Sequence, residues 1–110
     1  MTEIKDKPET KTFPLQAVTA CLLAELTALA ESELTLQGAP SPTAPGAITT
    51  MKIRLDSLTV VDITLALEDI IGFEPKDIVR TGGYDSIQAA LDHMVPRLIT
   101  AWKRKNPGAA

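Results

Sequence analysis

The chain has 110 residues, of which 45% are hydrophobic and 23% are charged, and its net charge at neutral pH is −3. This length suits one domain with short tails, and the four aromatic residues imply a core of mainly aliphatic side chains. The single cysteine, Cys21, excludes a disulfide framework and a cysteine metal cluster, and with neither a signal peptide nor a membrane-spanning stretch expected, the chain is predicted to be cytoplasmic.

Acidic and basic residues are unevenly distributed along the chain. Residues 56–92 hold eight acids and two bases, whereas residues 97–105 hold four bases and no acid. An acidic body argues against nucleic acid as the main partner, because phosphate would be repelled. The basic stretch is either a solvated tail or a contact for an acidic surface. A monomer is expected.

The first predicted element is a long amphipathic helix. Residues 1–11 are polar and read as a flexible tail, and Pro14 suits the first turn of a helix. Apolar residues then recur at spacings of three and four, which predicts a helix to about Glu31 or Glu33 with Cys21 packed as a core thiol. The apolar positions are Leu15, Val18, Leu22, Leu26 and Leu29.

A long connection follows, over about residues 34–54. Its density of proline and glycine makes a helix or strand there improbable on local grounds. Structureless connections of this length are uncommon in compact domains and are often functional. Five apolar side chains are expected to hold parts of it on the bundle: Leu34, Leu36, Ile48, Met51 and Ile53.

The central predicted element is a helix of about four turns between Leu55 and Gly72. Asp56 and Ser57 are polar capping residues at its start, and Gly72 suits a left-handed helix end. At about 100° per residue, one face is apolar and is expected to enter the core. That face comprises Val60, Ile63, Ala66, Leu67, Ile70 and Ile71.

The other side of this helix carries a mixed stripe, made of Leu58, Asp62, Leu65 and Asp69. A solvated face needs no leucines, and a buried face does not accept unpaired aspartates. The pattern predicts a docking surface for a partner with an apolar groove and a basic rim. The alternative is that the leucines cover the long connection. Val61, between the two faces, is a candidate for lining a cleft.

The last third of the chain predicts a short helical turn and then a long helix. Pro75, Ile78 and Val79 suit the short turn, with Phe73 as a core anchor, and Gly82-Gly83 interrupts the chain. The long helix is capped by Asp85 and Ser86, and Trp102 is expected to anchor its end. Pro96 either kinks this helix, ends it at about Met94 or starts a separate turn. His93 reads as surface or edge decoration. The apolar positions are Ile87, Ala90, Leu91, Met94 and Leu98.

The predicted fold is therefore all-α: a small bundle of three longer helices and one short helix, with a long first loop. The domain is expected to span residues 12–105, and residues 106–110 form a C-terminal tail. An enzyme is not expected, because the sequence offers no catalytic pair, metal spacing or phosphate loop.

This helix order, with Asp-Ser-Leu at the start of the central helix, resembles the acyl and peptidyl carrier proteins. The attachment motif is matched by residues 55–58 and the rest of the second helix by residues 61–71. Residues 73–78 and 86–92 are similar to the family's short helix and last helix. The resemblance covers about residues 53–95, and an acyl-carrier-like bundle with a long first loop is what it implies.

The resemblance implies that Ser57 carries a covalent 4′-phosphopantetheine arm derived from coenzyme A, preceded by Asp56. The arm would hold an acyl or aminoacyl group as a thioester for enzymes of fatty-acid, lipid, polyketide or peptide biosynthesis. The implied partners are a phosphopantetheinyl transferase and the enzymes that load and transfer the group. The stripe of Leu58, Asp62, Leu65 and Asp69 would read those partners.

Two positions depart from the family pattern and, together with the longer N-terminus and the basic C-terminus, indicate a specialised carrier. Arg54 stands where the family usually has glycine, and Thr59 where it often has an acid. Arg54 is either solvated or a contact for the phosphate of the arm. Ser57 could instead be a plain helix cap, since Asp85-Ser86-Ile87 has the same form without a leucine-acid stripe after it. The alternative function is an unmodified interaction module that docks through the same helix.

Overall fold

The computed structural model describes residues 12–108, and these residues are predominantly helical. The expected tail over residues 1–11 lies outside them. Within the described part there is no strand, and one antiparallel bridge joins Leu55 and Tyr84. The all-α prediction is confirmed. The elements are α1 (Leu15–Leu36), α2 (Ala47–Thr50), α3 (Ser57–Thr64), the 3₁₀ helix η2 (Leu65–Leu67), α4 (Glu68–Ile71) and α5 (Ile87–Lys105).

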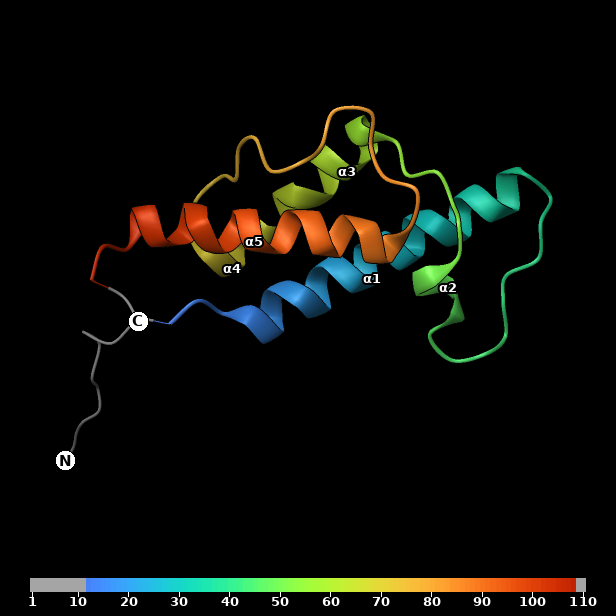
Figure 1. Cartoon of the computed structure of the whole chain (residues 1–110), viewed down its shortest axis with the longest axis horizontal. Helices are drawn as coiled ribbons and strands as arrows, with labels where there is room; N and C mark the ends of the chain where they lie inside the picture. Colours follow the sequence, from blue (N-terminus) through green and yellow to red (C-terminus); the bar gives the residue numbers. More distant parts are fainter. Residues whose placement is uncertain (1–11, 109–110) are drawn as a thin grey trace.

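The two long helices α1 and α5 form the body of the molecule (Figure 1). The α3–η2–α4 stretch packs against α1, and the short α2 packs against α5 and α1. Residues 72–86 return from the end of α4 to the start of α5 as an irregular segment. The long connection loops out beyond the end of α1 and carries α2.

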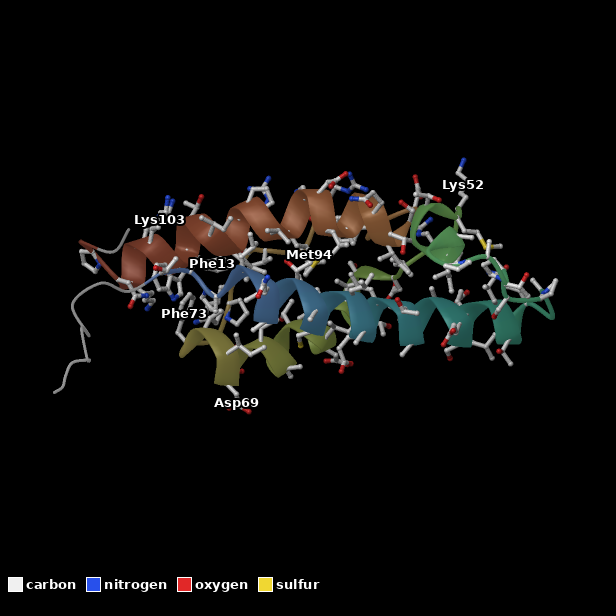
Figure 2. The ribbon with its side chains drawn as sticks, turned by 90° about the horizontal axis from the view of Figure 1, so that it is seen from below. Phe13, Lys52, Asp69, Phe73, Met94 and Lys103 are labelled. Carbon is white, nitrogen blue, oxygen red and sulfur yellow. The ribbon has the colours of Figure 1, made fainter. Side chains whose placement is uncertain are left out.

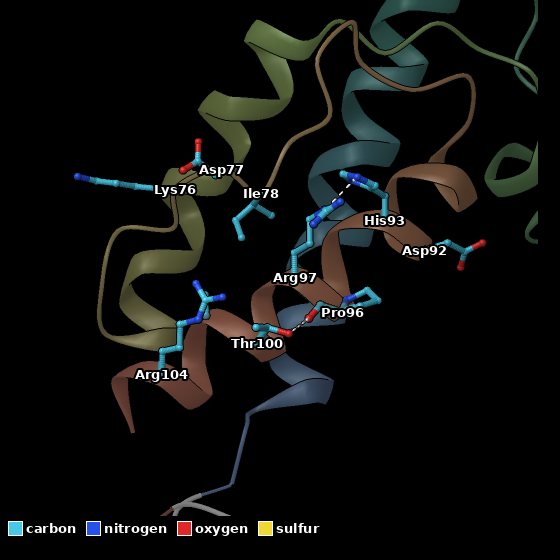
Figure 3. Close-up of a pocket in the computed structure, with 10 residues that line it drawn as sticks. Lys76, Asp77, Ile78, Asp92, His93, Pro96, Arg97, Thr100 and Arg104 are labelled. Carbon is cyan, nitrogen blue, oxygen red and sulfur yellow. Dashed lines mark hydrogen bonds between the residues drawn. The ribbon is translucent and has the colours of Figure 1, made fainter. Parts of the chain in front are cut away.

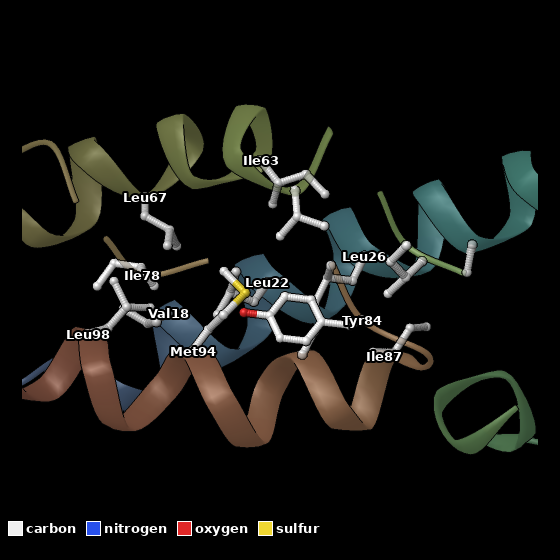
Figure 4. Close-up of a cluster of buried hydrophobic side chains, with 14 of the residues drawn as sticks. Val18, Leu22, Leu26, Ile63, Leu67, Ile78, Tyr84, Ile87, Met94 and Leu98 are labelled. Atoms are coloured by element: carbon white, nitrogen blue, oxygen red, sulfur yellow. The ribbon is translucent and has the colours of Figure 1, made fainter. Parts of the chain in front are cut away.

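One aliphatic core joins these helices, as Figure 4 shows around Leu22, Tyr84 and Met94. Apolar residues spaced by three and four put one face of each long helix into it. Leu29 and Leu91, at the edges of those faces, are half-buried. Cys21 is also half-buried against the core. The helical core residues are Val18, Leu22, Leu26, Ala30 and Leu34 from α1, and Ile87, Ala90, Met94, Leu98 and Trp102 from α5.

Helix α1 ends at Leu36, a few residues later than expected. By length and composition alone it is apolar enough to cross a membrane, which differs from the expectation that no stretch qualifies. Core helices of soluble proteins pass the same test, so this is weak evidence for a span. Leu36 is 80% exposed and does not tie the connection to the bundle.

The long connection contains a helical turn that was not expected. Helix α2 starts after Gly46, whose φ of 75° is left-handed, and its four residues contain neither proline nor glycine. Ile48 and Met51 pack partly against the core, and Ile53 is buried. Tertiary contact therefore stabilises a turn that local composition disfavours.

The central helix is interrupted rather than continuous. The Thr64 hydroxyl donates to the Val61 carbonyl at 2.6 Å, and the Leu65 amide bonds to the Asp62 carbonyl. Side-chain bonding of this kind competes with the α-helical pattern and favours the tighter 3₁₀ turn that follows. Gly72 ends α4 with φ 86°, which confirms the predicted left-handed stop.

The expected core face of this helix is correct except at Ala66. Ala66 is exposed, and Thr64 is buried in its place with its hydroxyl bonded to the backbone. The buried face of this helix is narrower than the helical wheel predicts, and Ala66 lies outside it. The buried residues are Val60, Ile63, Thr64, Leu67 and Ile71, and Ile70 is half-buried.

The predicted short helix around Pro75 is wrong, because residues 72–86 form no helix. Asp77 has a left-handed φ of 57°, which interrupts any helical run at that point. Ile78 is nevertheless buried, and Phe73 and Val79 pack partly against the core, so their anchoring role is retained without a helix. The segment is fixed by these buried side chains together with non-helical hydrogen bonds around Arg80, Gly83 and Tyr84.

Helix α5 continues through Pro96, so it neither ends at Met94 nor restarts there as a separate turn. Proline removes one backbone hydrogen bond inside a helix. Buried Met94 and Leu98 hold the helix on both sides of it, and the Thr100 hydroxyl donates to the Pro96 carbonyl at 3.1 Å. The basic residues 103–105 lie in the last turn of α5, where cations complement the helix dipole.

Trp102 anchors the end of α5, as expected. It is 5% exposed and meets the Phe13 ring edge to face at a centroid distance of 5.9 Å. Phe13 and Phe73 lie at this same end of the molecule (Figure 2), where the Lys105 ammonium sits 5.6 Å from the Phe73 ring centre. Aromatic contacts therefore close the bundle where α1 begins and α5 ends.

His93 lies half-buried at the edge of the bundle, as one of the two predicted settings has it, but it belongs to a hydrogen-bonded cluster that the sequence did not indicate. Its Nδ1 lies 2.8 Å from the hydroxyl of buried Tyr84, and its Nε2 accepts from Arg97 Nε at 3.0 Å. Because Nε2 accepts, Nδ1 carries the proton in neutral His93. The Tyr84 hydroxyl also accepts from the Arg80 amide at 2.8 Å. These bonds tie the irregular segment to α5.

The unfolding free energy is expected to fall as pH drops below about 6.5, in part through His93. Burial, followed by the charges of Arg97 and Arg80, lowers the pKa of His93 below its ordinary value of 6.5. The unfolded chain then binds more protons than the folded chain in mildly acidic solution, so stability is lost as pH falls. Urea midpoints by circular dichroism at pH 7.5 and 5.5 measure this loss. His93→Gln should flatten the dependence, and an equal slope in the variant would contradict the assignment.

Candidate functional site

The start of α3 is held by two extended segments that pair side by side. Leu55 and Tyr84 exchange backbone hydrogen bonds of 2.8 and 3.0 Å, and the Ile53 amide donates to the Asp85 carbonyl at 2.8 Å. Arg54 adds a bond from Nη2 to the Gly82 carbonyl at 3.1 Å. We call these paired residues, 53–55 and 82–85, the clamp. It fixes the chain immediately before α3 and before α5.

Gly83 allows the two segments of the clamp to approach each other. Its φ is +83°, and a Cβ atom at this position would overlap the Leu55 carbonyl oxygen and lie 3.0 Å from the Ser57 amide nitrogen. Only glycine accepts both the left-handed backbone and the close contact. The backbone at Ser57 is therefore placed by a residue that the sequence presents only as a break before the last helix.

Asp56, not Ser57, caps α3. The Asp56 carboxylate accepts from the Leu58 amide at 3.1 Å and from the Thr59 amide at 3.4 Å. Ser57 is the first helical residue and is half-buried. Its hydroxyl makes no hydrogen bond with any of residues 12–108. A cap role for Ser57 is thus unnecessary, and its oxygen remains available at the positive end of the helix dipole.

The second Asp-Ser pair has the opposite arrangement. Ser86 itself is the cap of α5, and its hydroxyl accepts from the Ala89 amide at 3.0 Å. Of the two Asp-Ser-apolar sequences, one therefore has its serine, Ser86, in a capping hydrogen bond, and the other leaves the Ser57 hydroxyl without a partner in residues 12–108. The sequence could not distinguish the two copies by local pattern, because both aspartate and serine are good caps.

The four stripe residues lie on the surface of α3, η2 and α4. Leu58 is 77% exposed and Leu65 is 51% exposed, and both aspartates are exposed between and beyond them. Asp69 projects away from the other helices (Figure 2). The leucines therefore do not cover the long connection, which removes the alternative reading of their position. Two large apolar side chains in water flanked by carboxylates form a surface suited to a partner.

A cleft opens beside α3, one turn after Ser57. Val61, which is 47% exposed, and Thr64 line one wall, and residues 74–79 line the other. Its volume is about 440 Å³. Ser57 and Val61 are four residues apart, so they share a face of α3. A group attached at Ser57 would find this cleft along the same face.

The Cys21 thiol is not activated as a nucleophile. Burial, and then the Glu25 carboxylate, raise the pKa of the Cys21 thiol, which disfavours a nucleophilic thiolate. In residues 12–108 no group of histidine, cysteine and acidic residues is placed to hold a metal ion. The guanidinium of Arg54 is bonded to Gly82 rather than simply solvated.

Comparison with protein-family models, with curated proteins and with solved structures finds no match.

Proposed function

We propose that the protein is a carrier that holds an acyl or aminoacyl group on a 4′-phosphopantetheine arm at Ser57, and that its fold is an acyl-carrier-like bundle. The supporting observation is the Ser57 hydroxyl, which lies on the first turn of α3 without an internal hydrogen bond while Asp56 caps the helix. The dipole at the helix start favours a phosphate on Ser57, while the Leu58 and Thr59 amides are already bonded to the Asp56 carboxylate. When bound, the arm supplies a terminal thiol that holds the cargo as a thioester.

Attachment requires a transferase, since no base in the described part of the chain is hydrogen-bonded to Ser57. In the balanced step, Ser57 Oγ forms a bond to the phosphorus next to pantetheine in coenzyme A. The phosphoanhydride bond breaks, and adenosine 3′,5′-bisphosphate leaves. The hydroxyl proton passes to a base of the transferase.

The stripe would select partners by charge and shape. Asp62 and Asp69 would attract basic rims, while Leu58 and Leu65 would enter apolar grooves. Such encounters are fast, weak and sensitive to salt, as a carrier that visits several enzymes requires. The partners would belong to fatty-acid, lipid, polyketide or peptide biosynthesis. The cleft beside Val61 would shelter part of the cargo.

Replacing Ser57 by alanine is expected to abolish modification. The protein and coenzyme A are incubated with phosphopantetheinyl transferases of broad specificity, and the intact mass is measured. One phosphopantetheine should add to the wild type and to Ser86→Ala, and none to Ser57→Ala. Ser86→Ala is the matched control because it stands in the same local sequence. Failure of several transferases to modify the wild type, or modification that persists in Ser57→Ala, would overturn the proposal.

Reversing the charge of the stripe is expected to slow modification severalfold at low salt. The double variant Asp62→Lys/Asp69→Lys changes the field beside Ser57 without changing the core, so helicity should be retained. The control Glu25→Lys/Glu31→Lys makes the same net charge change on exposed positions of α1. Initial rates at low and high salt are compared by mass spectrometry. Equal rates in both double variants would argue against docking by the stripe.

A second candidate function rests on the exposed leucines of the stripe. An interaction module that is never modified would use Leu58 and Leu65 to bind a partner helix or groove. It would keep binding that partner in Ser57→Ala, and it would accept no phosphopantetheine in the mass measurement. The addition of phosphopantetheine to the wild type, seen in the intact mass, therefore distinguishes the carrier from the interaction module.

A further inference from the structure

A second pocket, distinct from the cleft beside Val61, lies along α5 where residues 76–78 approach that helix. Its volume is about 620 Å³, and it opens between residues 76–78 and the α5 face that carries residues 92–104. His93, Arg97, Thr100 and Arg104 follow each other at spacings of four, three and four, so they form one line along the helix (Figure 3). Nothing in the proposed carrier role uses this pocket.

Arg97 is held in place by a relay of hydrogen bonds that reaches the core. Its Nε donates to His93 Nε2 at 3.0 Å, and His93 Nδ1 meets the hydroxyl of Tyr84 at 2.8 Å. Tyr84 is 1% exposed. An arginine oriented through Nε keeps its two terminal nitrogens available, in the planar fork that matches phosphate and carboxylate.

Two more cations line the pocket with no hydrogen bond to the rest of the described chain. Lys76 and Arg104 donate to none of residues 12–108. Figure 3 shows the Arg104 side chain directed toward the pocket side of α5. Seven residues separate Arg97 from Arg104, which corresponds to about 10 Å along a helix axis. The two arginines thus leave α5 about 10 Å apart and lie at the two ends of an elongated site.

The surface between these ends carries both apolar and polar groups. Ala101 and the buried Ile78, which extends toward α5, supply its apolar part, and Pro96 lies beside Arg97. Thr100 adds a hydroxyl that donates to the Pro96 carbonyl and keeps its oxygen lone pairs for a further contact. A ligand would therefore meet a positive group, an apolar patch with the Thr100 hydroxyl beside it, and a second positive group in sequence.

The carboxylates at the rim do not neutralise the centre of the pocket. Asp92 points away from Arg97 in Figure 3 and accepts from Gln88 Nε2 at 2.8 Å, on the side toward the start of α5. Asp77 lies on the opposite segment, directed away from Arg104. The electrostatic character of the line from His93 to Arg104 is therefore set by its two arginines.

We propose that this pocket binds a small elongated organic anion with an acidic group at each end, one held by Arg97 and the other by Arg104, and with an apolar middle over Ile78 and Ala101. Carboxylate and phosphate share the required chemistry. Matching two charges across an apolar stretch gives selectivity by length, because a ligand that is too short reaches only one arginine. The proposal does not depend on modification of Ser57.

The test titrates the full chain with straight-chain dicarboxylates and follows backbone amide shifts by NMR. Azelate, whose carboxylates are about 10 Å apart by the extent of an extended chain, should shift residues 93–104 and bind at least about tenfold more tightly than succinate or nonanoate. Arg97→Gln and Arg104→Gln should each reduce azelate binding about tenfold. Inorganic phosphate and a terminal bisphosphate of similar length distinguish carboxylate from phosphate ligands, and preference for either supports the shared chemistry.

Lys103→Gln provides the matched control, because it removes one charge from the neighbouring, exposed position of α5. It should leave azelate binding within about twofold of the wild type. Equal binding of succinate, nonanoate and azelate, an equal loss in Lys103→Gln and Arg104→Gln, or no shift in residues 93–104 would each overturn the proposal. Circular dichroism of each variant confirms that the helices are retained.

Discussion

Gly83→Ala is expected to lower the free energy of unfolding by about 2–5 kcal/mol. The new methyl group would overlap the Leu55 carbonyl oxygen, so the two segments of the clamp must separate. Alanine also resists the φ of +83° that the turn requires. A loss of this size is a large fraction of the stability of a small domain. Urea unfolding followed by circular dichroism measures it.

Gly82→Ala is the matched control for this prediction. Gly82 has a φ of +89°, but an added Cβ atom would meet nothing within 4 Å. It should show only the strain of a left-handed alanine, about 1–2 kcal/mol. The difference between the two variants isolates the contact with Leu55. Equal losses at both positions would mean that backbone strain, and not the close approach of the segments, sets the requirement for glycine.

Leu22→Ala is expected to lower the free energy of unfolding by about 2–5 kcal/mol. Leu22 is fully buried in the middle of α1, among the side chains that join it to the other helices (Figure 4). Removing its branched end leaves a cavity that surrounding aliphatic residues fill only in part. The change in urea midpoint gives the loss.

Leu36→Ala makes the same chemical change near the end of the same helix. Leu36 is 80% exposed, so its replacement should change stability by no more than about 0.5 kcal/mol. A comparable loss in both variants would show that the effect comes from helix propensity rather than from burial. A small loss at Leu22 alone would contradict its place in the core.

The long helices could be predicted from the sequence because apolar spacing alone specifies their buried faces. Val18, Leu22 and Leu26 on α1, and Met94 and Leu98 on α5, recur at helical intervals and are all buried. The stop at Gly72 and the cap at Ser86 were also predictable, since each depends on one residue with a strong local preference.

The features that were missed depend on contacts between distant residues or on competing local bonds. Helix α2 forms in a proline-rich stretch because Ile48 and Met51 reach the core, and α5 continues through Pro96 because Met94 and Leu98 are buried around it. No helical turn forms at Pro75 because Asp77 turns the chain into the left-handed region. The first two outcomes depend on tertiary contacts and the third on a local backbone conformation, and helix propensity alone predicts none of them.

The candidate site shows the same division between local and distant causes. The exposure of the stripe could be predicted from a helical wheel, because its four residues are spaced by three and four along one side of the helix. Ser57 and Ser86 differ because Asp56 is the cap of α3, whereas Ser86 is itself the cap of α5. Capping preference does not predict this difference, since aspartate and serine are both favoured caps. The role of Gly83 beside Ser57 required the pairing of two segments about thirty residues apart along the chain.

The single tryptophan has a consequence for spectroscopy. Trp102 sits against Phe13, far along α5 from the Leu55–Tyr84 pairing, and it is the only tryptophan in the sequence. Its fluorescence therefore reports the closure of one tip of the bundle, whereas far-ultraviolet dichroism averages over every helix. If that tip frays before the centre, emission will change at a lower denaturant concentration than ellipticity, and the gap between the two curves will measure how independently the tip opens.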